Sequence, residues 1–468
     1  MTNKNCDIGL IGLGVMGQNL LLNMADHGFV VAGYEHKTKA ERLRKAAKKQ
    51  SIYLASDIAV FLNLLKKPRT IMLLVPAGKI VDSVIDELLP HLESGDLIID
   101  AGNSHFTDTD RRTLTLQKSN ILFLGVGISG GEAGARRGPS IMPGGSKKAY
   151  EQVRTLLEAI AAKVNNDPCV TYLGEGSVGH YVKMVHNGIE YGMMQLIAET
   201  YDLMKRGLGF NNQQLQVVYD SWNHSELSSY LLEITSHIFS KVDEKTHQSL
   251  IDEIKGIAAQ NGTGMWTSQS AMELQVPTPI IDLAVMMRDL SVLKNERESA
   301  NALYQQPAKL LDVNHNAFLM HLKNAFYTAM TVVYAQGMAL LKVASEKYHY
   351  QLNLESVARI WRGGCIIRAT LLEDICSIYQ LNNKLPNLLL DPNLSKKIIA
   401  HQDGLRHIVS QASASGIPVP TMMATLSYFD AYRSSWQPAN LIQAQRDYFG
   451  SHRYERMDSP GTFHTEWE

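Results

Sequence analysis

The sequence predicts an α/β domain followed by a large all-helical domain and an extended C-terminal tail. Strand-like runs alternate with helical segments in the first third, whereas the pattern from about residue 179 is helical and strand-like runs are scarce. With 468 residues, 45% of them hydrophobic, the chain exceeds what one core normally supports. We therefore expect three segments, at residues 1–178, 179–435 and 436–468.

The first predicted strand begins at Asp7 and leads into a glycine-rich turn with the spacing of a dinucleotide fingerprint. The turn reads Gly12-Leu13-Gly14-Val15-Met16-Gly17. Glycines let the pyrophosphate approach closely, and the N-terminus of the following helix stabilises its charge. Glu35 closes the next predicted strand, residues 29–34, at the usual distance. The alternative is a turn that binds nothing, but its place between a strand and a helix favours a Rossmann-type coenzyme site.

Three further runs are expected to be strands of the same sheet, at residues 70–75, 97–100 and 121–126. Each ends in a loop where the ligands of such sheets gather. Asn103 follows the second run, and Ser129-Gly130-Gly131 follows the third. Both loops are therefore expected to contribute to a binding site.

A polar stripe opens the helical part of the chain. Its members are Lys183, His186, Asn187 and Glu190, with Tyr191 beside them. Spacings of three, four and seven residues place the first four on one face of a helix. A lysine and a glutamate two turns apart can serve as acid and base at a carbon next to a carbonyl, if burial tunes their pKa values. The alternative is a solvated face, but the flanking residues are mostly apolar, so we expect the stripe to face a cleft.

The helical part also carries a faint internal repeat. An offset of about 140 residues aligns Trp222 with Trp361 and Lys183 with Lys323. The second copy would keep the scaffold and lose the polar stripe. Chance similarity between helical stretches remains the alternative.

Composition and charge exclude several classes of protein. Lys and Arg number 45 against 46 Asp and Glu, which argues against a broad nucleic-acid footprint or attraction to a membrane surface. No apolar run approaches the length of a membrane span, and the N-terminus lacks a secretory signal, so a cytoplasmic location is the default expectation. The four cysteines lie far apart without ligand spacing, so neither a disulfide nor a metal site is expected.

The C-terminal segment contains Arg446 and His452, which could clamp an anion. Surface residues of a loose terminus are the alternative interpretation of this pair. Motifs spread over the whole chain resemble one family, the decarboxylating 6-phosphogluconate dehydrogenases. These motifs are residues 127–145, the Lys183 helix, residues 262–267, residues 361–368 and the Arg446 tail.

The resemblance implies a Rossmann-type coenzyme domain, an all-helical substrate and dimerisation domain, and a homodimer. Each tail would carry Arg446 and His452 into the partner's site. The implied reaction, part of the pentose phosphate pathway and of gluconate utilisation, converts 6-phosphogluconate to ribulose 5-phosphate and carbon dioxide while NADP is reduced. Lys183 would take the proton of the 3-hydroxyl, and Glu190 would later protonate C1.

The resemblance also assigns ligand contacts. The sugar acid would be held by Asn103, Ser129, Gly130, Gly131, His186 and Asn187. Its phosphate would be held by Tyr191, Thr263, Arg288, Arg446 and His452. The residue at Asn261 is usually a lysine in this family and Met265 replaces a second lysine, so we expect weaker substrate binding. Losing one charged contact costs about 1.5–3 kcal/mol if nothing replaces it.

Two departures concern the coenzyme. The family usually has Asn-Arg-Ser/Thr where this chain has Glu35-His36-Lys37, and Val-Lys-Ala-Gly where it has Val75-Pro76-Ala77-Gly78. A carboxylate repels the 2′-phosphate of NADP and prefers the 2′-hydroxyl of NAD, so we hypothesise a preference for NAD. His36, Lys37 and Lys39 could still receive a phosphate, with Glu35 turned to solvent. Asn103 is expected to contact the coenzyme as well as the substrate.

Two other functions remain open at this point. One is a related dehydrogenase for another sugar acid, which only the change at Asn261 favours. The other is a non-catalytic dinucleotide-binding sensor, against which the retention of both Lys183 and Glu190 counts.

Overall fold

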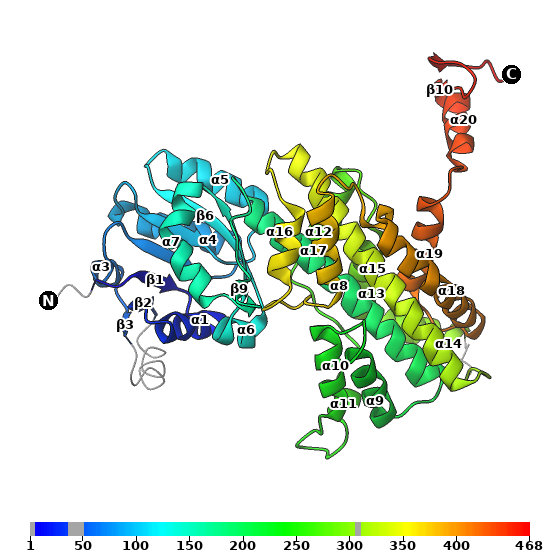
Figure 1. The fold of residues 1–468 in the computed structure, drawn as a ribbon, viewed down its shortest axis with the longest axis horizontal. Helices are drawn as coiled ribbons and strands as arrows, with labels where there is room; N and C mark the ends of the chain where they lie inside the picture. Colours follow the sequence, from blue (N-terminus) through cyan, green and yellow to red (C-terminus); the bar gives the residue numbers. More distant parts are fainter. Residues whose placement is uncertain (1–4, 36–50, 305–309) are drawn as a thin grey trace.

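A computed structural model describes residues 5–35, 51–304 and 310–468, and its N-terminal third is built on one sheet (Figure 1). Within these residues the sheet has seven strands in the order β3-β2-β1-β4-β5-β6-β7. Neighbouring strands from β1 to β6 are parallel, and β7 runs antiparallel to β6. The strands are β1 (Ile8–Ile11), β2 (Val31–Tyr34), β3 (Ile52–Ala55), β4 (Thr70–Leu73), β5 (Leu97–Asp100), β6 (Leu122–Ser129) and β7 (Ser140–Gly145).

Helices cover both faces of the sheet because its strands are apolar on both sides. Leu97 and Ile99 of β5 belong to one core, shared with α1 and α7, whereas Ile98 between them belongs to a second core, shared with α3, α4 and α5. The helices are α1 (Val15–Asp26), α3 (Ile58–Asn63), α4 (Lys79–Leu88), α5 (Phe106–Gln117), α6 (Gly131–Arg137) and α7 (Lys147–Ile160).

The expected α/β domain is confirmed, with two strands that the sequence did not reveal. The runs predicted at residues 70–75, 97–100 and 121–126 form β4, β5 and β6. β3 is an edge strand, and three of its four residues are only half-buried. β7 reads Ser-Ile-Met-Pro-Gly-Gly, and its glycines and proline are typical of a turn rather than a strand.

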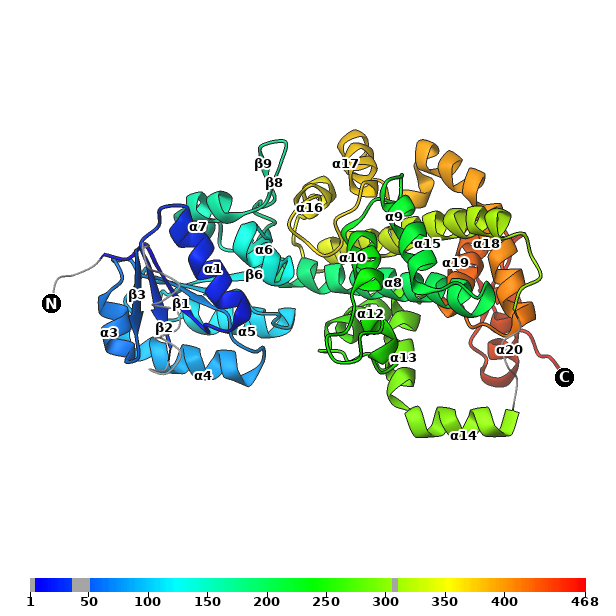
Figure 2. The ribbon, with the colours of Figure 1, turned by 90° about the horizontal axis from the view of Figure 1, so that it is seen from below.

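The chain from α8 onward is mainly helical, as expected. Two short antiparallel pairs lie outside the large sheet, β8 (Lys163–Val164) with β9 (Asp167–Pro168) and, in the tail, β10 (Tyr454–Glu455) with β11 (Thr462–Phe463). Figure 2 shows α8 running from the sheet region into the helices. The helices are α8 (Val178–Asp202), α9 (Asn212–Asn223), α10 (Tyr230–Ser240), α11 (Leu250–Glu253), α12 (Thr263–Glu273), α13 (Pro279–Val292), α14 (Lys294–Tyr304), α15 (His315–Lys347), α16 (Leu354–Trp361), α17 (Leu371–Leu381), α18 (Pro392–Ser415), α19 (Pro420–Tyr432) and α20 (Ala439–Gly450). No helix among the described residues is long and apolar enough to cross a membrane.

The two longest helices, α8 and α15, pack closely at glycines. A Cβ atom on Gly192 of α8 would lie 2.5 Å from Cγ2 of Val333, and one on Gly337 of α15 would lie 2.5 Å from Cδ1 of Ile189. Two shorter helices follow each long one, α9 and α10 after α8 and α16 and α17 after α15. This order supports the predicted duplication, which stays a prediction, as do the three domain boundaries.

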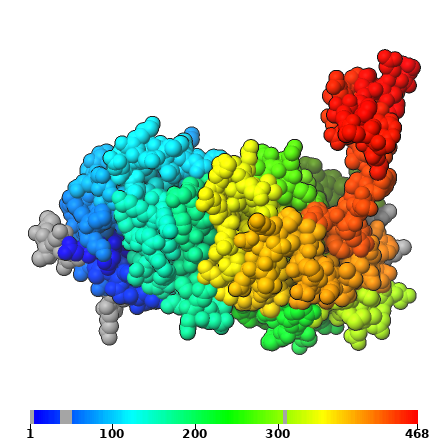
Figure 3. Space-filling model, turned by 45° about the horizontal axis from the view of Figure 1, so that its top comes forward, coloured from blue at the N-terminus to red at the C-terminus, as the bar shows by residue number. Residues whose placement is uncertain are grey.

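The C-terminal tail stands away from the body of the protein (Figure 3). The tail has a structure of its own because the buried carboxylate of Asp447 accepts hydrogen bonds from residues that follow it in the tail. Its carboxylate accepts hydrogen bonds from the backbone N–H groups of Arg453 and Thr465 and from the indole of Trp467, at 2.9, 3.1 and 2.9 Å. The tail is therefore a folded unit carried on a connector, rather than a loose terminus.

Candidate active site

The polar stripe of α8 is buried where the helix meets the sheet. Lys183 is 7% exposed and His186 is fully buried. A Cβ atom on Gly127 of β6 would lie 2.4 Å from Cβ of Lys183, so only glycine lets the lysine sit this close to the strand. Burial of these two residues argues against the solvated face that was the alternative, whereas the predicted position in a cleft stays a prediction because no residue of the stripe lines the cleft described below.

Burial shifts the pKa values of Lys183 and Glu190 towards each other. It lowers the pKa of the Lys183 ammonium, although the carboxylate of Glu190 partly opposes this effect. It raises the pKa of Glu190, opposed by the charges of Lys183 and Arg288. A lysine that loses its proton easily and a glutamate that keeps one suit a base and an acid that act in turn.

His186 links the stripe to the loop after β6. Its Nε2 lies 3.0 Å from the hydroxyl oxygen of Ser129, and its Nδ1 lies 3.1 Å from Oδ1 of Asn187. Burial and the nearby Lys183 lower the pKa of His186 well below its ordinary value, so the ring is neutral. The Ser129 hydroxyl also accepts a hydrogen bond from the backbone N–H of Ile366 at 3.3 Å. The stripe, the sheet and the loop after α16 thus meet at one serine.

The Gly130-Gly131 turn depends on the absence of side chains. Gly130 has a φ of 128°, and a Cβ atom there would lie 2.4 Å from the carbonyl oxygen of Gly364. Gly131 has a φ of 60°, and no atom lies within 4 Å of where its Cβ would be. The turn therefore packs against the loop after α16 on one side and stays open on the other.

The phosphate residues predicted within one protomer lie near the same helix. Asn187 donates a hydrogen bond to Oγ1 of Thr263, the first residue of α12, at 3.0 Å. The guanidinium of Arg288 lies 3.4 Å from the centre of the Tyr191 ring. Burial lowers the pKa of Arg288, and the ring of Tyr191 and the carboxylate of Glu190 oppose this. The structure therefore brings Thr263, Tyr191 and Arg288 together with the stripe.

A cleft of about 830 Å³ runs beside the fingerprint turn. Its predicted lining residues are Gly14, Val15, Met16, Gly17, Val75, Pro76, Ala77, Asn103 and Asn261. Eight further lining residues were not predicted: Leu74, Gly78, Ala101, Gly102, His105, Asp108, Ile128 and Trp266. Most of these residues follow β4 and β5, so their positions just after predicted strands could have identified them as residues of a binding cleft. Trp266 comes from α12, and its ring lies 5.0 Å from that of His105 across the cleft.

The fingerprint glycines fit a dinucleotide. A Cβ atom on Gly12 would lie 2.5 Å from the carbonyl oxygen of Leu74, and one on Gly17 would lie 2.1 Å from that of Gly12. A Cβ atom on Gly14 would meet nothing within 4 Å, and Gly14 precedes α1 without a side-chain cap. Two glycines thus allow the tight turn, and the third leaves the helix N-terminus open to an anion.

Not every residue that was predicted to contact a ligand is among those that line this cleft. Glu35 is placed at the end of β2, where its backbone N–H donates to the carbonyl of Ala55 at 3.0 Å. His36 and Lys37 lie outside the described residues. Arg446 and His452 are exposed on the tail, which projects away from the stripe of the same chain (Figure 1). Their predicted role therefore needs a second chain.

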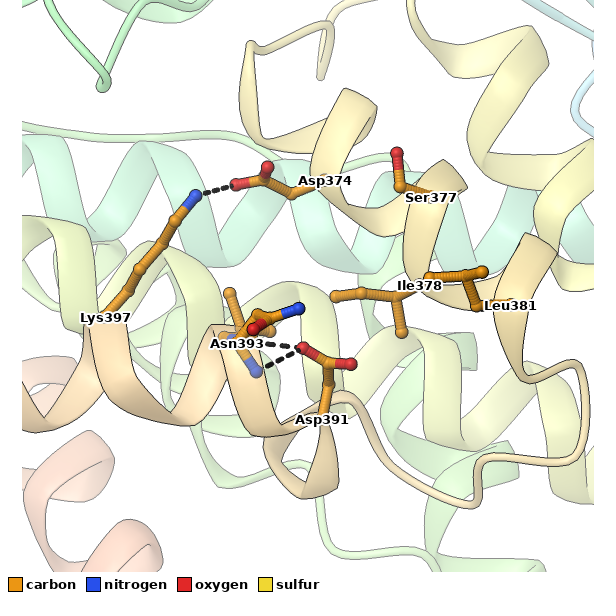
Figure 4. Close-up of a pocket in the computed structure, with 8 residues that line it drawn as sticks. Asp374, Ser377, Ile378, Leu381, Asp391, Asn393 and Lys397 are labelled. Carbon is orange, nitrogen blue, oxygen red and sulfur yellow. Dashed lines mark hydrogen bonds and ion pairs between the residues drawn. The ribbon is translucent and has the colours of Figure 1, made fainter.

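A second hollow, between α17 and α18, contains none of the predicted residues (Figure 4). It measures about 100 Å³, and its charged groups are paired. The ammonium of Lys397 lies 2.6 Å from Asp374, and Asp391 accepts hydrogen bonds from the first turn of α18. The Lys397–Asp374 pair joins α17 to α18, whereas Asp391 caps α18, and the hollow offers no comparable chemistry. Among the described residues, no group of histidines, cysteines and carboxylates could hold a metal ion.

Comparisons with known proteins agree with this arrangement. Residues 7–174 match the model for the NAD binding domain of 6-phosphogluconate dehydrogenase, and residues 179–467 match its C-terminal domain. The chain is 49% identical over 98% of its length, and 98% of the relative's, to the NADP(+)-dependent decarboxylating 6-phosphogluconate dehydrogenase of Bacillus subtilis. It is 48% identical, over 98% of its length and 97% of the relative's, to the decarboxylating enzyme of Synechocystis.

A solved structure gives the same result for the fold. The chain superposes on 6-phosphogluconate dehydrogenase of Plasmodium falciparum with a TM-score of 0.95 and 46% identity, covering 99% of this chain and 100% of that one. The Plasmodium enzyme is described in its apo form and with its cofactor NADP+ and its substrate 6-phosphogluconate. Matches of this identity along nearly the whole chain show that it belongs to the 6-phosphogluconate dehydrogenase family.

Proposed function

We propose that the protein oxidises and decarboxylates 6-phosphogluconate, forming ribulose 5-phosphate and carbon dioxide with reduction of a nicotinamide coenzyme. The observation that carries the proposal is the pair of Lys183, which is buried, and Glu190, which is half-buried, on one face of α8 with opposite pKa shifts. The sheet that α8 adjoins bears a cleft suited to a dinucleotide. The names of the relatives support the same activity.

The residues of this chain divide the proton transfers between them. Lys183, neutral when the substrate binds, accepts the proton of the 3-hydroxyl. The coenzyme, when bound, accepts the hydride from C3. Protonated Lys183 then gives its proton to the new keto oxygen while carbon dioxide departs, and as Glu190 protonates C1 of the resulting enediol, Lys183 takes the hydroxyl proton back. The cycle closes when both groups exchange protons with solvent.

Contacts within the site support the substrate assignment. Ser129, Gly130 and Gly131 would receive the sugar acid with Asn103, His186 and Asn187, because its hydroxyls donate and accept hydrogen bonds and its carboxylate accepts them. Tyr191, Thr263 and Arg288 would receive the phosphate, with Asn261 beside them in place of the usual lysine. We propose a homodimer in which Arg446 of the partner subunit and the partner's His452 complete the phosphate site, since neither reaches the stripe of its own chain.

The preference for NAD is also a proposal. Glu35 at the end of β2 and Pro76 in the cleft support it, because a carboxylate disfavours a 2′-phosphate and proline removes a nearby cation. The relative from B. subtilis is NADP-dependent by name. We expect that Glu35→Asn combined with His36→Arg raises the ratio of kcat/KM for NADP to that for NAD by roughly tenfold or more, as one lost repulsion would. An unchanged ratio in a folded variant would defeat the role of Glu35.

The first test measures initial rates with 6-phosphogluconate, using NAD and NADP separately and following carbon dioxide release. Reduction of either coenzyme with equal release of carbon dioxide supports the activity, and the better coenzyme decides the preference. Coenzyme reduction without carbon dioxide would mean that 6-phosphogluconate is oxidised but not decarboxylated, which would contradict the proposed reaction. No turnover with 6-phosphogluconate but turnover with another sugar acid would indicate the related dehydrogenase, which the exchange at Asn261 would explain. Tight coenzyme binding with no turnover on any sugar acid would indicate the non-catalytic sensor.

A further inference from the structure

Arg112 is a buried charge that the proposed chemistry does not use. It lies on α5 and is 2% exposed, whereas the side chain of its neighbour Arg111 is 53% exposed. Taking a guanidinium out of water is costly unless its N–H groups find partners. The partners of Arg112 therefore show what the protein gains by burying it.

The guanidinium of Arg112 joins two loops at the edge of the sheet. On one side, Nε donates to Oδ1 of Asp82 at 2.7 Å and Nη2 donates to the carbonyl of Gly78 at 3.0 Å. On the other side, Nη1 donates to Oδ2 of Asp100 at 3.2 Å and to the hydroxyl of Ser104 at 3.1 Å. Gly78 and Asp82 lie at the start of α4, after β4, whereas Asp100 ends β5 and Ser104 lies in the loop after it, so one planar fork spans both connections.

The same two loops form a wall of the coenzyme cleft. Residues 74–78 line it after β4, and residues 101–103 line it after β5. The carboxylate of Asp100 also accepts hydrogen bonds from the Ser104 hydroxyl at 2.6 Å and from the backbone N–H of Gly102 at 3.1 Å. A Cβ atom on Gly102 would lie only 3.0 Å from the carbonyl oxygen of Val75. A shift of either loop would therefore change the shape of the cleft.

The strand order indicates which half of the coenzyme this wall receives. β1 carries the fingerprint, β2 with Glu35 lies on one side of it, and β4 and β5 lie on the other. A dinucleotide lies across such a switch point with its adenosine ribose at the end of β2, so its nicotinamide half extends over β4 and β5. The loops that Arg112 joins are therefore those under the nicotinamide.

We propose that Arg112 is a positioning residue that fixes the β4–α4 and β5–α5 loops relative to each other and so preforms the seat of the nicotinamide half. This rests on the proposed use of a nicotinamide coenzyme. Without the guanidinium of Arg112, the two loops become ordered only when the coenzyme binds. The entropy lost in ordering them weakens binding of the whole dinucleotide. ADP, which lacks the nicotinamide half, does not incur it.

The test compares Arg112→Lys with Arg111→Lys by calorimetric titration of the full-length protein with NAD, NADP and ADP. Both variants keep the charge and lose a guanidinium that bonds to Asp82, since Arg111 also donates to that carboxylate, at 3.0 and 2.9 Å. We expect Arg112→Lys to raise the Kd of both dinucleotides roughly tenfold and to leave the Kd of ADP within about twofold, the effect of one charged hydrogen bond. Arg111→Lys should leave all three values unchanged.

Two results would overturn the proposal: unchanged dinucleotide Kd values in folded Arg112→Lys, or an equal loss for ADP and the dinucleotides, which would indicate general destabilisation. If Arg112→Lys does not fold, Ser104→Ala decides, because it removes one of the four bonds without a change of charge. That variant should weaken dinucleotide binding about threefold and spare ADP, and an unchanged value refutes the proposal. Wild-type protein that binds no dinucleotide at all would instead refute the proposed function.

Discussion

The two longest helices, α8 and α15, pack against each other, and the two lysines that the predicted repeat aligns differ in burial and in ion pairing. Lys183 of α8 is buried and, among the described residues, makes no ion pair, whereas Lys323 of α15 is partly exposed and lies 3.1 Å from a carboxylate oxygen of Glu226. The positions on α15 aligned with the rest of the stripe hold Phe326, Tyr327 and Met330, all buried. Among the described residues, the two packed helices thus bury one lysine without an ion pair and keep the aligned lysine partly exposed in one.

The largest effect should come from replacing each of these lysines. We expect Lys183→Met to lower kcat by roughly 10³ to 10⁴-fold, because the base is lost, while the Kd of the coenzyme stays within about twofold. Lys323→Met should leave kcat unchanged and cost at most about 1 kcal/mol of stability, as for other exposed ion pairs. Steady-state kinetics and coenzyme titration of both variants check this. Substantial turnover by folded Lys183→Met would defeat the assignment of the base.

The sequence was sufficient for parts of the site that follow a local period or spacing. The fingerprint was recognisable because its glycines have a fixed spacing within one strand–turn–helix unit. The stripe of Lys183 was recognisable because its residues have the spacing of one helix face. The stacking of Arg288 on Tyr191 was not, because it depends on how α13 packs on α8. The edge-on contact of Trp266 with His105 was not, because it depends on how α12 lies against the start of α5. The fork of Arg112 was hidden for the same reason, since its partners come from two different loops.

A smaller effect should come from replacing Glu190, and this variant tests the role of the acid separately from that of the base Lys183. Glu190→Gln should lower kcat by roughly 10²-fold, because the group that protonates C1 is lost. The wild-type profile of kcat/KM against pH should be bell-shaped, with two apparent pKa values that belong to the coupled pair of Lys183 and Glu190. Because glutamine does not titrate, one limb of the bell should disappear in the variant. A full bell in Glu190→Gln would assign that limb to another group.

The smallest effect on catalysis should come from a second buried carboxylate on α8, Glu199. It accepts hydrogen bonds from the backbone N–H groups of Thr421 and Met422 at 2.9 and 3.0 Å, so it caps α19, the helix that leads to the tail. We expect Glu199→Gln to leave kcat within about twofold, because this carboxylate holds two helices together and touches no part of the stripe. A loss of kcat comparable to that of Glu190→Gln would contradict the distinction between the two carboxylates.

Glu199 should nevertheless control how stability depends on pH. Burial raises its pKa to about 7 from an ordinary 4.5, so between these values the folded protein binds more protons than the unfolded chain. Its contribution is complete below the unfolded pKa and is lost as the pH rises through the folded pKa, by about 3 kcal/mol in all. Glu199→Gln should therefore show a shallower fall in unfolding free energy between pH 5 and pH 8 than the wild type, as measured by chemical denaturation. An identical slope would mean that the backbone N–H groups of α19 stabilise the ionised carboxylate fully, and that burial alone does not tune the carboxylates of α8.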